Sequence, residues 1–186
     1  YKIEQAMGLV GGKQDQYASA FGGINFIEFK RDNVKLEQLK LSKNFIKKLE
    51  NKLVLVYTGK PHFSGNTNKL MIENLKRDKN TKNLLAIKNI AIQMKNALKR
   101  QDIYKFANLM NEETNERKKL HKDIVGKQSQ DIIKKGMEND AISAKVCGSG
   151  GGGSILFFTD NKTKLKKAFK NKVIDFKFDF EGLRYL

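Results

Sequence analysis

The sequence predicts an α+β fold, and two observations lead to that prediction. Few segments have the apolar pattern of a strand, whereas several have the three-to-four-residue apolar spacing of an amphipathic helix. The predicted helices also follow one another along the middle of the chain instead of alternating with strands. With 186 residues, of which 39% are hydrophobic, the chain can bury one core, as a domain with an appendage.

The first part of the chain is predicted to contain helical segments followed by a pair of strands. Gly22 and Gly23 interrupt the helical pattern, and apolar and polar residues alternate after them. The predicted elements are the end of a helix at 1–9, a turn at 10–13, a helix at 14–21, a strand at 24–30, a turn at 31–33 and a second strand at 34–39.

The middle of the chain is predicted to consist of helices around one buried strand. Ser42 and Asp102 are suitable N-caps, because their side-chain oxygens can accept hydrogen bonds from the first turn of a helix. The continuous apolar run Leu53–Tyr57 predicts a buried strand. The predicted helices are one after Ser42 that includes Phe45, Ile46 and Leu49, one at 67–79, one at 84–98, and one after Asp102 that includes Ile103, Phe106, Leu109 and Met110.

The last part of the chain is predicted to return to strands. The polar residues 112–122 of the preceding helix are expected to project into solvent. The further predicted elements are an irregular segment at 123–130, a helix at 131–140, strands at 143–147 and 155–159, a basic helix that Asp160 caps and that runs to Phe169, and a strand at 173–180. The last strand would place Phe176, Phe178 and Phe180 on one face, which we expect to belong to the core.

The net charge of +17 and the pI near 9.8 favour an anionic partner. One hypothesis is a surface that binds nucleic acid or another polyanion. The alternative is lysine spread over solvated faces, because there is no long basic block and arginine, which makes bidentate contacts to bases, is scarce. On this second interpretation the positive field still attracts small anionic substrates.

The numbers of cysteine and histidine residues and the lengths of the apolar runs exclude disulfides, several kinds of metal site and membrane spans. The single Cys147 rules out an intramolecular disulfide and a cysteine-rich metal site, and we expect a reduced core residue in a cytoplasmic protein. His62 and His121 are too few for a histidine-based metal site, and we expect His121 to be solvated. No apolar run approaches the roughly 20 residues of a membrane span. Because the chain opens without Met and in helical spacing, we expect the C-terminal part of a longer protein.

The segment Gly12-Lys13-Gln14-Asp15-Gln16 places a carboxylate directly after a glycine-containing turn. Transfer of a phosphoryl group to a hydroxyl needs a group that orients the hydroxyl and accepts its proton, and a carboxylate can serve. The alternative is an acid at the start of a helix that stabilises the helix by about 1 kcal/mol.

The segment Gly148–Gly153 puts a loop of nearly bare backbone between two apolar runs. Because Ser149 supplies the only side chain, the backbone N–H groups can approach an anion closely and form a nest for phosphate. A run of four glycines and a serine also occurs in flexible linkers. The apolar runs on either side look like paired core strands, and residues 155–186 are too few for a second folded unit, so we favour a binding loop.

Together these segments resemble the GHMP small-molecule kinases, which include galactokinase, homoserine kinase and mevalonate kinase. Residues 12–16 are similar to the Gly-x-x-Asp-Gln of the family, and residues 144–153 are similar to its third motif. Within the family, residues 11–29 are most similar to kinases of a heptose 7-phosphate. The resemblance covers nearly the whole chain, but only the later half of the family pattern.

The resemblance implies a GHMP C-terminal-type domain at residues 40–186, with a ferredoxin-like antiparallel sheet and helices. Residues 1–39 would be a remnant of the N-terminal catalytic domain, which is expected either to be poorly ordered or to pair with another copy through its open edge. The implied reaction is ATP- and Mg²⁺-dependent phosphorylation of the anomeric hydroxyl of a heptose 7-phosphate, for nucleotide-activated heptose and surface glycans. The alternatives are a GHMP kinase of fucose or galactose, a basic nucleic-acid-binding module, and a regulatory or structural role.

The resemblance also implies roles for particular residues. Asp15 would be the catalytic base. The implied substrate- or phosphate-binding residues are Gly148, Ser149, Gly150, Gly151, Gly152 and Thr58, and the further substrate contacts are Lys13, Gln16, Lys60 and His62. A plain surface loop is the alternative for the segment that holds Lys60 and His62. The ATP-binding Pro-x-x-x-Gly-Leu-Gly-Ser-Ser-Ala loop of the family does not occur in the sequence, so we expect little or no kinase activity from the chain alone.

Overall fold

The computed structural model describes residues 6–7, 12–31, 33–59 and 80–184. Most of the predicted helix at 1–9 and the whole of the one at 67–79 lie outside the described residues, and so do Lys60 and His62. The described helices are α2 Gln14–Phe21, α3 Lys43–Lys52, α5 Thr81–Lys99, α6 Ile103–Leu120, α7 Lys127–Met137, α8 Lys162–Phe169 and the short 3₁₀ helix η1 Lys170–Lys172. The strands are β1 Asn25–Lys30, β2 Asn33–Gln38, β3 Leu53–Tyr57, β4 Ala141–Val146, β5 Ser154–Thr159 and β6 Val173–Ile174.

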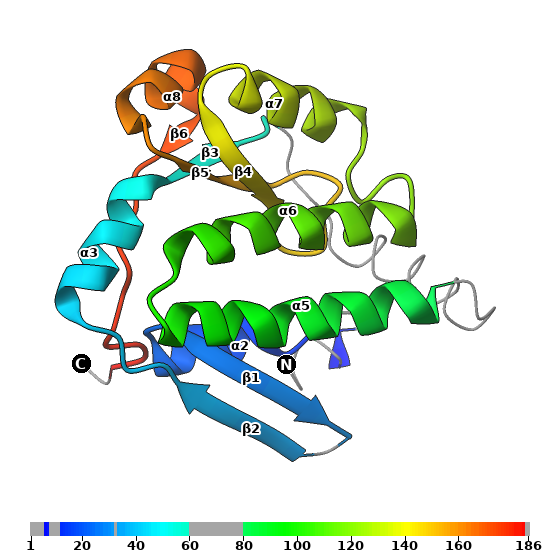
Figure 1. Ribbon diagram of the computed structural model, residues 1–186. Coiled ribbons are helices and arrows are strands. Elements are labelled where there is room, and N and C mark those ends of the chain that lie inside the picture. Colours follow the sequence, from blue (N-terminus) through cyan, green and yellow to red (C-terminus); the bar gives the residue numbers. More distant parts are fainter. Residues whose placement is uncertain (1–5, 8–11, 32, 60–79, 185–186) are drawn as a thin grey trace.

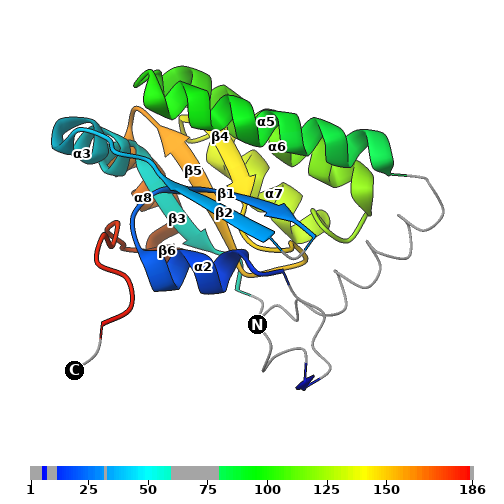
Figure 2. The ribbon, with the colours of Figure 1, turned by 90° about the horizontal axis from the view of Figure 1, so that it is seen from below.

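A four-stranded antiparallel sheet in the order β4-β5-β3-β6 forms the centre of the fold. Helices α7 and α8 cover one face, and α3, α5 and α6 lie on the other side (Figures 1 and 2). The continuous apolar run of β3 therefore serves two cores. Val54 and Val56 pack toward α7 and α8, whereas Leu53 packs with α3 and α6. The predicted α+β class is confirmed, and so is the buried strand.

The two cores are built from residues that are far apart in the sequence. The core beneath α7 and α8 consists of Val54, Val56, Leu120, Ile124, Val125, Ile132, Ala144, Val146, Ile155, Phe157, Leu165 and Phe169. The core toward α3, α5 and α6 consists of Leu39, Phe45, Leu49, Leu53, Leu98, Ile103, Ala107, Met110 and Phe158. Because β4, β5 and β3 contribute to both, removal of any of these strands would open both cores to water.

A separate two-stranded antiparallel sheet is formed by β1 and β2, with Ile27 opposite Leu36. It lies beside α5, as Figure 1 shows, and is held there by polar and aromatic contacts. Lys95 on α5 places its Nζ 4.1 Å from the centre of the Phe26 ring and 3.3 Å from a carboxylate oxygen of Glu37 on β2. This arrangement fixes the hairpin against the helical side of the molecule.

Only one side of the polar half of α6 projects into solvent, so the prediction was wrong for the other side. It faces the outer edge of β4, which is an end strand of the sheet. The Asn111 side-chain amide donates to the carbonyl of Ile142 at 3.1 Å, and its oxygen accepts from the Ala144 N–H at 3.0 Å. The Thr114 hydroxyl donates to the Ala144 carbonyl at 2.9 Å. Side chains of α6 thus satisfy edge groups that a further strand would otherwise pair.

The segment 173–180 forms a strand only at Val173–Ile174, so the longer strand was wrongly predicted. After Ile174 the chain leaves the sheet and returns to α2, where the Gly23 N–H donates to the Asp179 carbonyl at 2.6 Å. The three phenylalanines still stack edge to face, at 5.9 and 6.4 Å between ring centres. Phe176 and Phe178 join the core as expected, whereas Phe180 remains exposed.

Two helix starts also differ from the prediction. The N-cap of α8 is Asn161, whose side chain accepts from the Lys164 N–H, because Asp160 instead forms an ion pair with Lys52 and accepts from Tyr104. Helix α7 begins at Lys127, within the segment expected to be irregular, after a Gly126 N-cap. Ser42 and Asp102 cap α3 and α6 as predicted, each accepting a backbone N–H three residues on.

We predict that Asn111→Ala destabilises the fold by about 2 kcal/mol, because it leaves a buried N–H and a carbonyl of β4 without partners. Urea unfolding followed by circular dichroism measures this change. Asn96→Ala on α5 is the matched control, since Asn96 is exposed and alanine favours a helix. Equal midpoints for the two variants would contradict the role of Asn111 at the strand edge.

Candidate active site

Asp15 lies in the first turn of α2 and its side chain is exposed. The helix is short and ends at Gly22, whose backbone has a φ of 59° and contacts Gly182 of the C-terminal segment closely. A carboxylate in this position lies near the positive end of the helix and faces solvent, so it can meet a ligand. Lys13 and Gln16 lie beside it, both half-buried.

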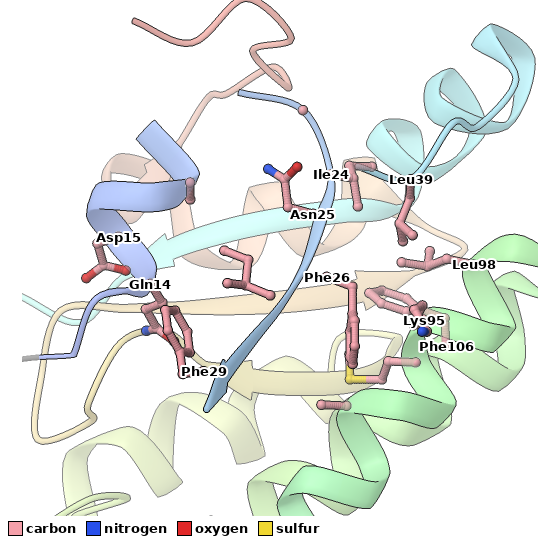
Figure 3. Close-up of a pocket in the computed structure, with 15 residues that line it drawn as sticks. Gln14, Asp15, Ile24, Asn25, Phe26, Phe29, Leu39, Lys95, Leu98 and Phe106 are labelled. Atoms are coloured by element: carbon pink, nitrogen blue, oxygen red, sulfur yellow. The ribbon is translucent and has the colours of Figure 1, made fainter. Parts of the chain in front are cut away.

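A hollow of about 450 Å³ opens beside Asp15, and we call it the β1–α5 hollow. Figure 3 shows Asp15 and Gln14 at one end of it, and Phe26, Lys95 and Phe106 at the other. Its lining is mostly apolar and also includes Ile24, Phe29, Leu39, Met94 and Leu98. A carboxylate at the rim of an apolar hollow is suited to act on the polar end of a small molecule.

The glycine segment forms the loop between β4 and β5, as predicted. Positive φ values of 65° at Gly148, 87° at Gly150, 78° at Gly151 and 73° at Gly153 explain why the loop is built from glycine. A Cβ at Gly150 would lie 2.3 Å from the carbonyl oxygen of Ile124. The loop is therefore packed tightly against the turn that follows α6, and a side chain there would push it away.

Some backbone groups of this loop already have partners. The Gly151 N–H donates to the Ile124 carbonyl at 2.8 Å, and the Cys147 N–H donates to the Ser154 carbonyl at 2.9 Å. The amide of Gly151 is thus committed to the fold in this conformation. The nest for an anion at the segment Gly148–Gly152 stays a prediction.

Thr58 lies directly beside the glycine loop at the end of β3. Its N–H donates to the Gly153 carbonyl at 2.9 Å, and its own carbonyl accepts from the Gln128 side chain at 2.9 Å. The residue is buried. The structure therefore brings Thr58 and the loop together. In Figures 2 and 3 the start of α2, the end of β3 and the β4–β5 loop all lie toward the same side of the molecule.

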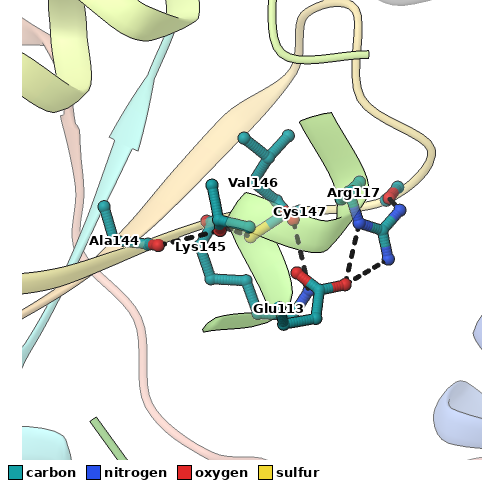
Figure 4. Close-up of polar contacts among 8 residues, drawn as sticks. Glu113, Arg117, Ala144, Lys145, Val146 and Cys147 are labelled. Carbon is teal, nitrogen blue, oxygen red and sulfur yellow. Dashed lines mark hydrogen bonds and ion pairs between the residues drawn. The ribbon is translucent and has the colours of Figure 1, made fainter. Parts of the chain in front are cut away.

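Sequence reasoning missed a buried cluster of charges at the base of the loop, formed by Glu113, Arg117 and Lys145 (Figure 4). One carboxylate oxygen of Glu113 accepts from the Arg117 guanidinium at 2.8 and 2.5 Å. The other lies 2.8 Å from the Lys145 Nζ. Arg117 also donates to the Gly148 carbonyl at 3.0 Å. The signal was the four-residue spacing of Glu113 and Arg117, which places both on one face of α6.

Burial and charge act against each other within this cluster. Burial opposes ionisation of Glu113, but the charges of Lys145 and Arg117 outweigh it and hold the pKa of that carboxyl below its ordinary value. Burial lowers the pKa of Lys145, and the Glu113 carboxylate only partly opposes this. Burial also raises the pKa of the Cys147 thiol, which fits a reduced structural cysteine.

Two classes of feature are not found among the described residues. No group of three or more His, Cys, Asp or Glu is placed there to hold a metal ion. Within the same ranges, no helix combines the length and the apolar character that crossing a membrane requires. His121 is only partly buried, and its Nδ1 accepts from the Asp123 N–H at 3.2 Å.

Residues 94–172 match the family described as GHMP kinases C terminal. Residues 94–172 thus form a GHMP kinase C-terminal domain, and the resemblance inferred from the Asp15 and glycine segments is confirmed. Among curated proteins it is 34% identical, over 191 residues, to the D-glycero-alpha-D-manno-heptose 7-phosphate kinase of Campylobacter jejuni subsp. jejuni serotype O:2. The match covers 99% of this chain and 56% of the relative, so the chain spans little more than half the length of that kinase.

Solved structures give the same result. A Campylobacter jejuni protein assigned as a sugar kinase is similar at a TM-score of 0.69 and 33% identity, over 98% of this chain and 53% of that protein. A D-glycero-D-manno-heptose 1-phosphate kinase from Bacteroides thetaiotaomicron is similar at 0.64 and 29% identity, over 96% of this chain and 50% of that one. The described fold is thus similar to about half of each of these two structures.

We predict that the stabilising effect of Glu113 depends on pH. Because its pKa is lowered in the fold, the contribution is complete above the ordinary carboxyl value of 4.5 and is lost as the pH falls below it. At pH 7, Glu113→Gln should destabilise the protein by about 2 kcal/mol, since it weakens contacts to two cations. The difference from the unsubstituted chain should narrow between pH 5 and about 3.

Urea unfolding at a series of pH values measures this dependence. Glu112→Gln is the matched control, because Glu112 neighbours Glu113 on α6 but is exposed. A gap between Glu113→Gln and the unsubstituted chain that stays constant down to pH 3 would contradict the prediction.

Proposed function

We propose that the chain is part of an ATP-dependent sugar kinase that phosphorylates the anomeric hydroxyl of a heptose 7-phosphate. The observation that carries the proposal is the 34% identity to a heptose 7-phosphate kinase over 99% of this chain. The product would feed nucleotide-activated heptose into surface glycans. MgATP would be the second substrate, with Mg²⁺ accompanying the nucleotide.

In this proposal Asp15 orients the anomeric hydroxyl and accepts its proton. Its exposure at the rim of the β1–α5 hollow supports that role, because a base must reach the attacking oxygen. Lys13 and Gln16, on the same turn, would contact the sugar. The loop Gly148–Gly152 would bind the phosphate through backbone amides, with Thr58 holding the loop in place from β3.

The sequence lacks the glycine-rich ATP loop of the family, and the Campylobacter kinase extends well beyond the part that this chain matches. We therefore propose that the 186-residue chain alone has little or no kinase activity. We also propose that residues 1–39 belong to the catalytic N-terminal domain and residues 40–186 to the C-terminal domain. The separation of the β1–β2 sheet from the four-stranded sheet supports this division. The single cysteine supports a cytoplasmic location.

The two-stranded sheet leaves strand edges that can pair with a second copy of the chain. We predict that the isolated chain self-associates through these edges. Sedimentation velocity at rising protein concentration measures this, and Leu36→Pro on β2, at a position whose N–H points away from β1, should shift the population back toward monomer. A monomer at all concentrations would contradict the prediction.

We predict that Asp15→Asn lowers turnover by about 10²–10⁴-fold while the protein remains folded. A coupled assay with ATP and D-glycero-D-manno-heptose 7-phosphate measures this on the longest natural protein that contains the sequence, because the chain alone is proposed to be inactive. Asp175→Asn is the matched control, because Asp175 is an exposed aspartate whose contact is an ion pair with Lys166. Turnover that survives Asp15→Asn would remove the proposed base.

The same assay with a panel of other sugars distinguishes the proposed heptose phosphate kinase from the alternative functions. Activity on fucose or galactose, but not on the heptose phosphate, would keep the family and change the substrate. Turnover by the isolated chain would contradict our proposal that it is inactive by itself. Absence of activity on every sugar, together with salt-sensitive binding to unrelated DNA or RNA, would favour the nucleic-acid-binding alternative.

A further inference from the structure

The loop between β4 and β5 is held at two points, and both anchors come from α6 and the turn that follows it. The guanidinium of Arg117 donates to the Gly148 carbonyl at 3.0 Å, at the start of the loop. The carbonyl of Ile124 accepts from the Gly151 N–H at 2.8 Å, in its middle. The second anchor is reinforced by close packing at Gly150, whereas the first has no such support.

Gly148 depends on its hydrogen bond more than the other loop residues do. It is exposed, its φ is 65°, and no atom lies within 4 Å of the position a Cβ would take. Side-chain packing therefore cannot hold this residue. The contact from Arg117 is the interaction that fixes the direction of the peptide after Gly148.

Arg117 is suited to this task because its guanidinium is itself held rigidly. Its Nε and one Nη bind the same oxygen of Glu113, and the other Nη is directed at Gly148, as Figure 4 shows for the Glu113 side of the cluster. Glu113 is buried, and its other carboxylate oxygen is held by Lys145 of β4, which lies three residues before Gly148. The planar fork of arginine satisfies both partners at once, which lysine cannot do.

We propose that Arg117, held by Glu113, is the positioning residue of the glycine loop and sets the loop amides in the arrangement that binds the phosphate of the substrate. This proposal rests on the proposed kinase function for the identity of the ligand, but not for the role of Arg117 in the loop. The cluster carries two positive charges and one negative charge, so a purely electrostatic role in attracting phosphate is the competing explanation.

Hydrogen exchange tests the positioning role on the 186-residue chain without any need for catalysis. In Arg117→Lys the N–H groups of Gly151 and Cys147, which have partners in the fold, should exchange about tenfold faster, because loss of a charged hydrogen bond loosens the loop. Amides of β3 should be unaffected. Arg100→Lys is the matched control, since Arg100 is exposed at the end of α5. Unchanged loop exchange in Arg117→Lys would overturn the proposal.

Glu113→Gln separates positioning from electrostatics, and it also serves if Arg117→Lys fails to fold. The substitution adds one unit of positive charge near the loop but releases the guanidinium. Positioning predicts faster loop exchange and a KM for the phosphorylated sugar raised about tenfold, with the KM for ATP unchanged, in the longest natural protein that contains this sequence. Electrostatic attraction alone predicts a lower KM and unchanged exchange, and that result would overturn the proposal.

The two readouts also distinguish failure of this proposal from failure of the proposed function. Absence of turnover on every sugar phosphate would reject the kinase reaction, while loop exchange in Arg117→Lys would still decide whether Arg117 holds the loop.

Discussion

The hydrogen-bonded contact between α6 and the outer edge of β4 is the constraint on which the rest of the structure depends. A helix cannot pair with a strand through its backbone, so Asn111 and Thr114 supply side-chain groups that replace the missing strand. The contact closes the end of the four-stranded sheet. It also sets the distance between α6 and the β4–β5 loop, because Arg117 continues the same row of polar side chains to Gly148.

The same contact links the stability of the fold to the proposed site. The row begins with neutral hydrogen bonds at Asn111 and ends with a buried charge cluster around Glu113. Buried ion pairs add little stability on balance, because desolvation offsets attraction, but they specify one geometry. A glycine loop has few side chains whose packing could select one conformation. A buried ion pair directly beside the loop can supply that selection.

The N-terminal part of the chain has a different basis for its position. The β1–β2 hairpin contributes no fully buried residue and is held against α5 by Lys95, Glu37 and Phe26. Tyr17 of α2 packs edge to face on Phe29 of β1. The returning C-terminal segment adds backbone contacts at Gly22 and Gly23. The carboxylate of Asp15 thus lies on a small appendage that packs against the rest of the fold.

By itself the sequence determined the α+β class, the buried strand Leu53–Tyr57, the caps at Ser42 and Asp102, and the glycine loop, because each depends on local spacing or on one residue type. It did not determine the end of β6 at Ile174, the cap at Asn161 or the environment of Glu113. Those outcomes depend on partners distant in the sequence. The C-terminal segment leaves the sheet and hydrogen-bonds to residues beside α2, and Asp160 forms an ion pair with Lys52. One side of the polar part of α6 packs against the edge of β4. A polar helix face is expected to be exposed to solvent unless its side chains can hydrogen-bond to an unpaired strand edge. Only the tertiary structure shows where such an edge lies.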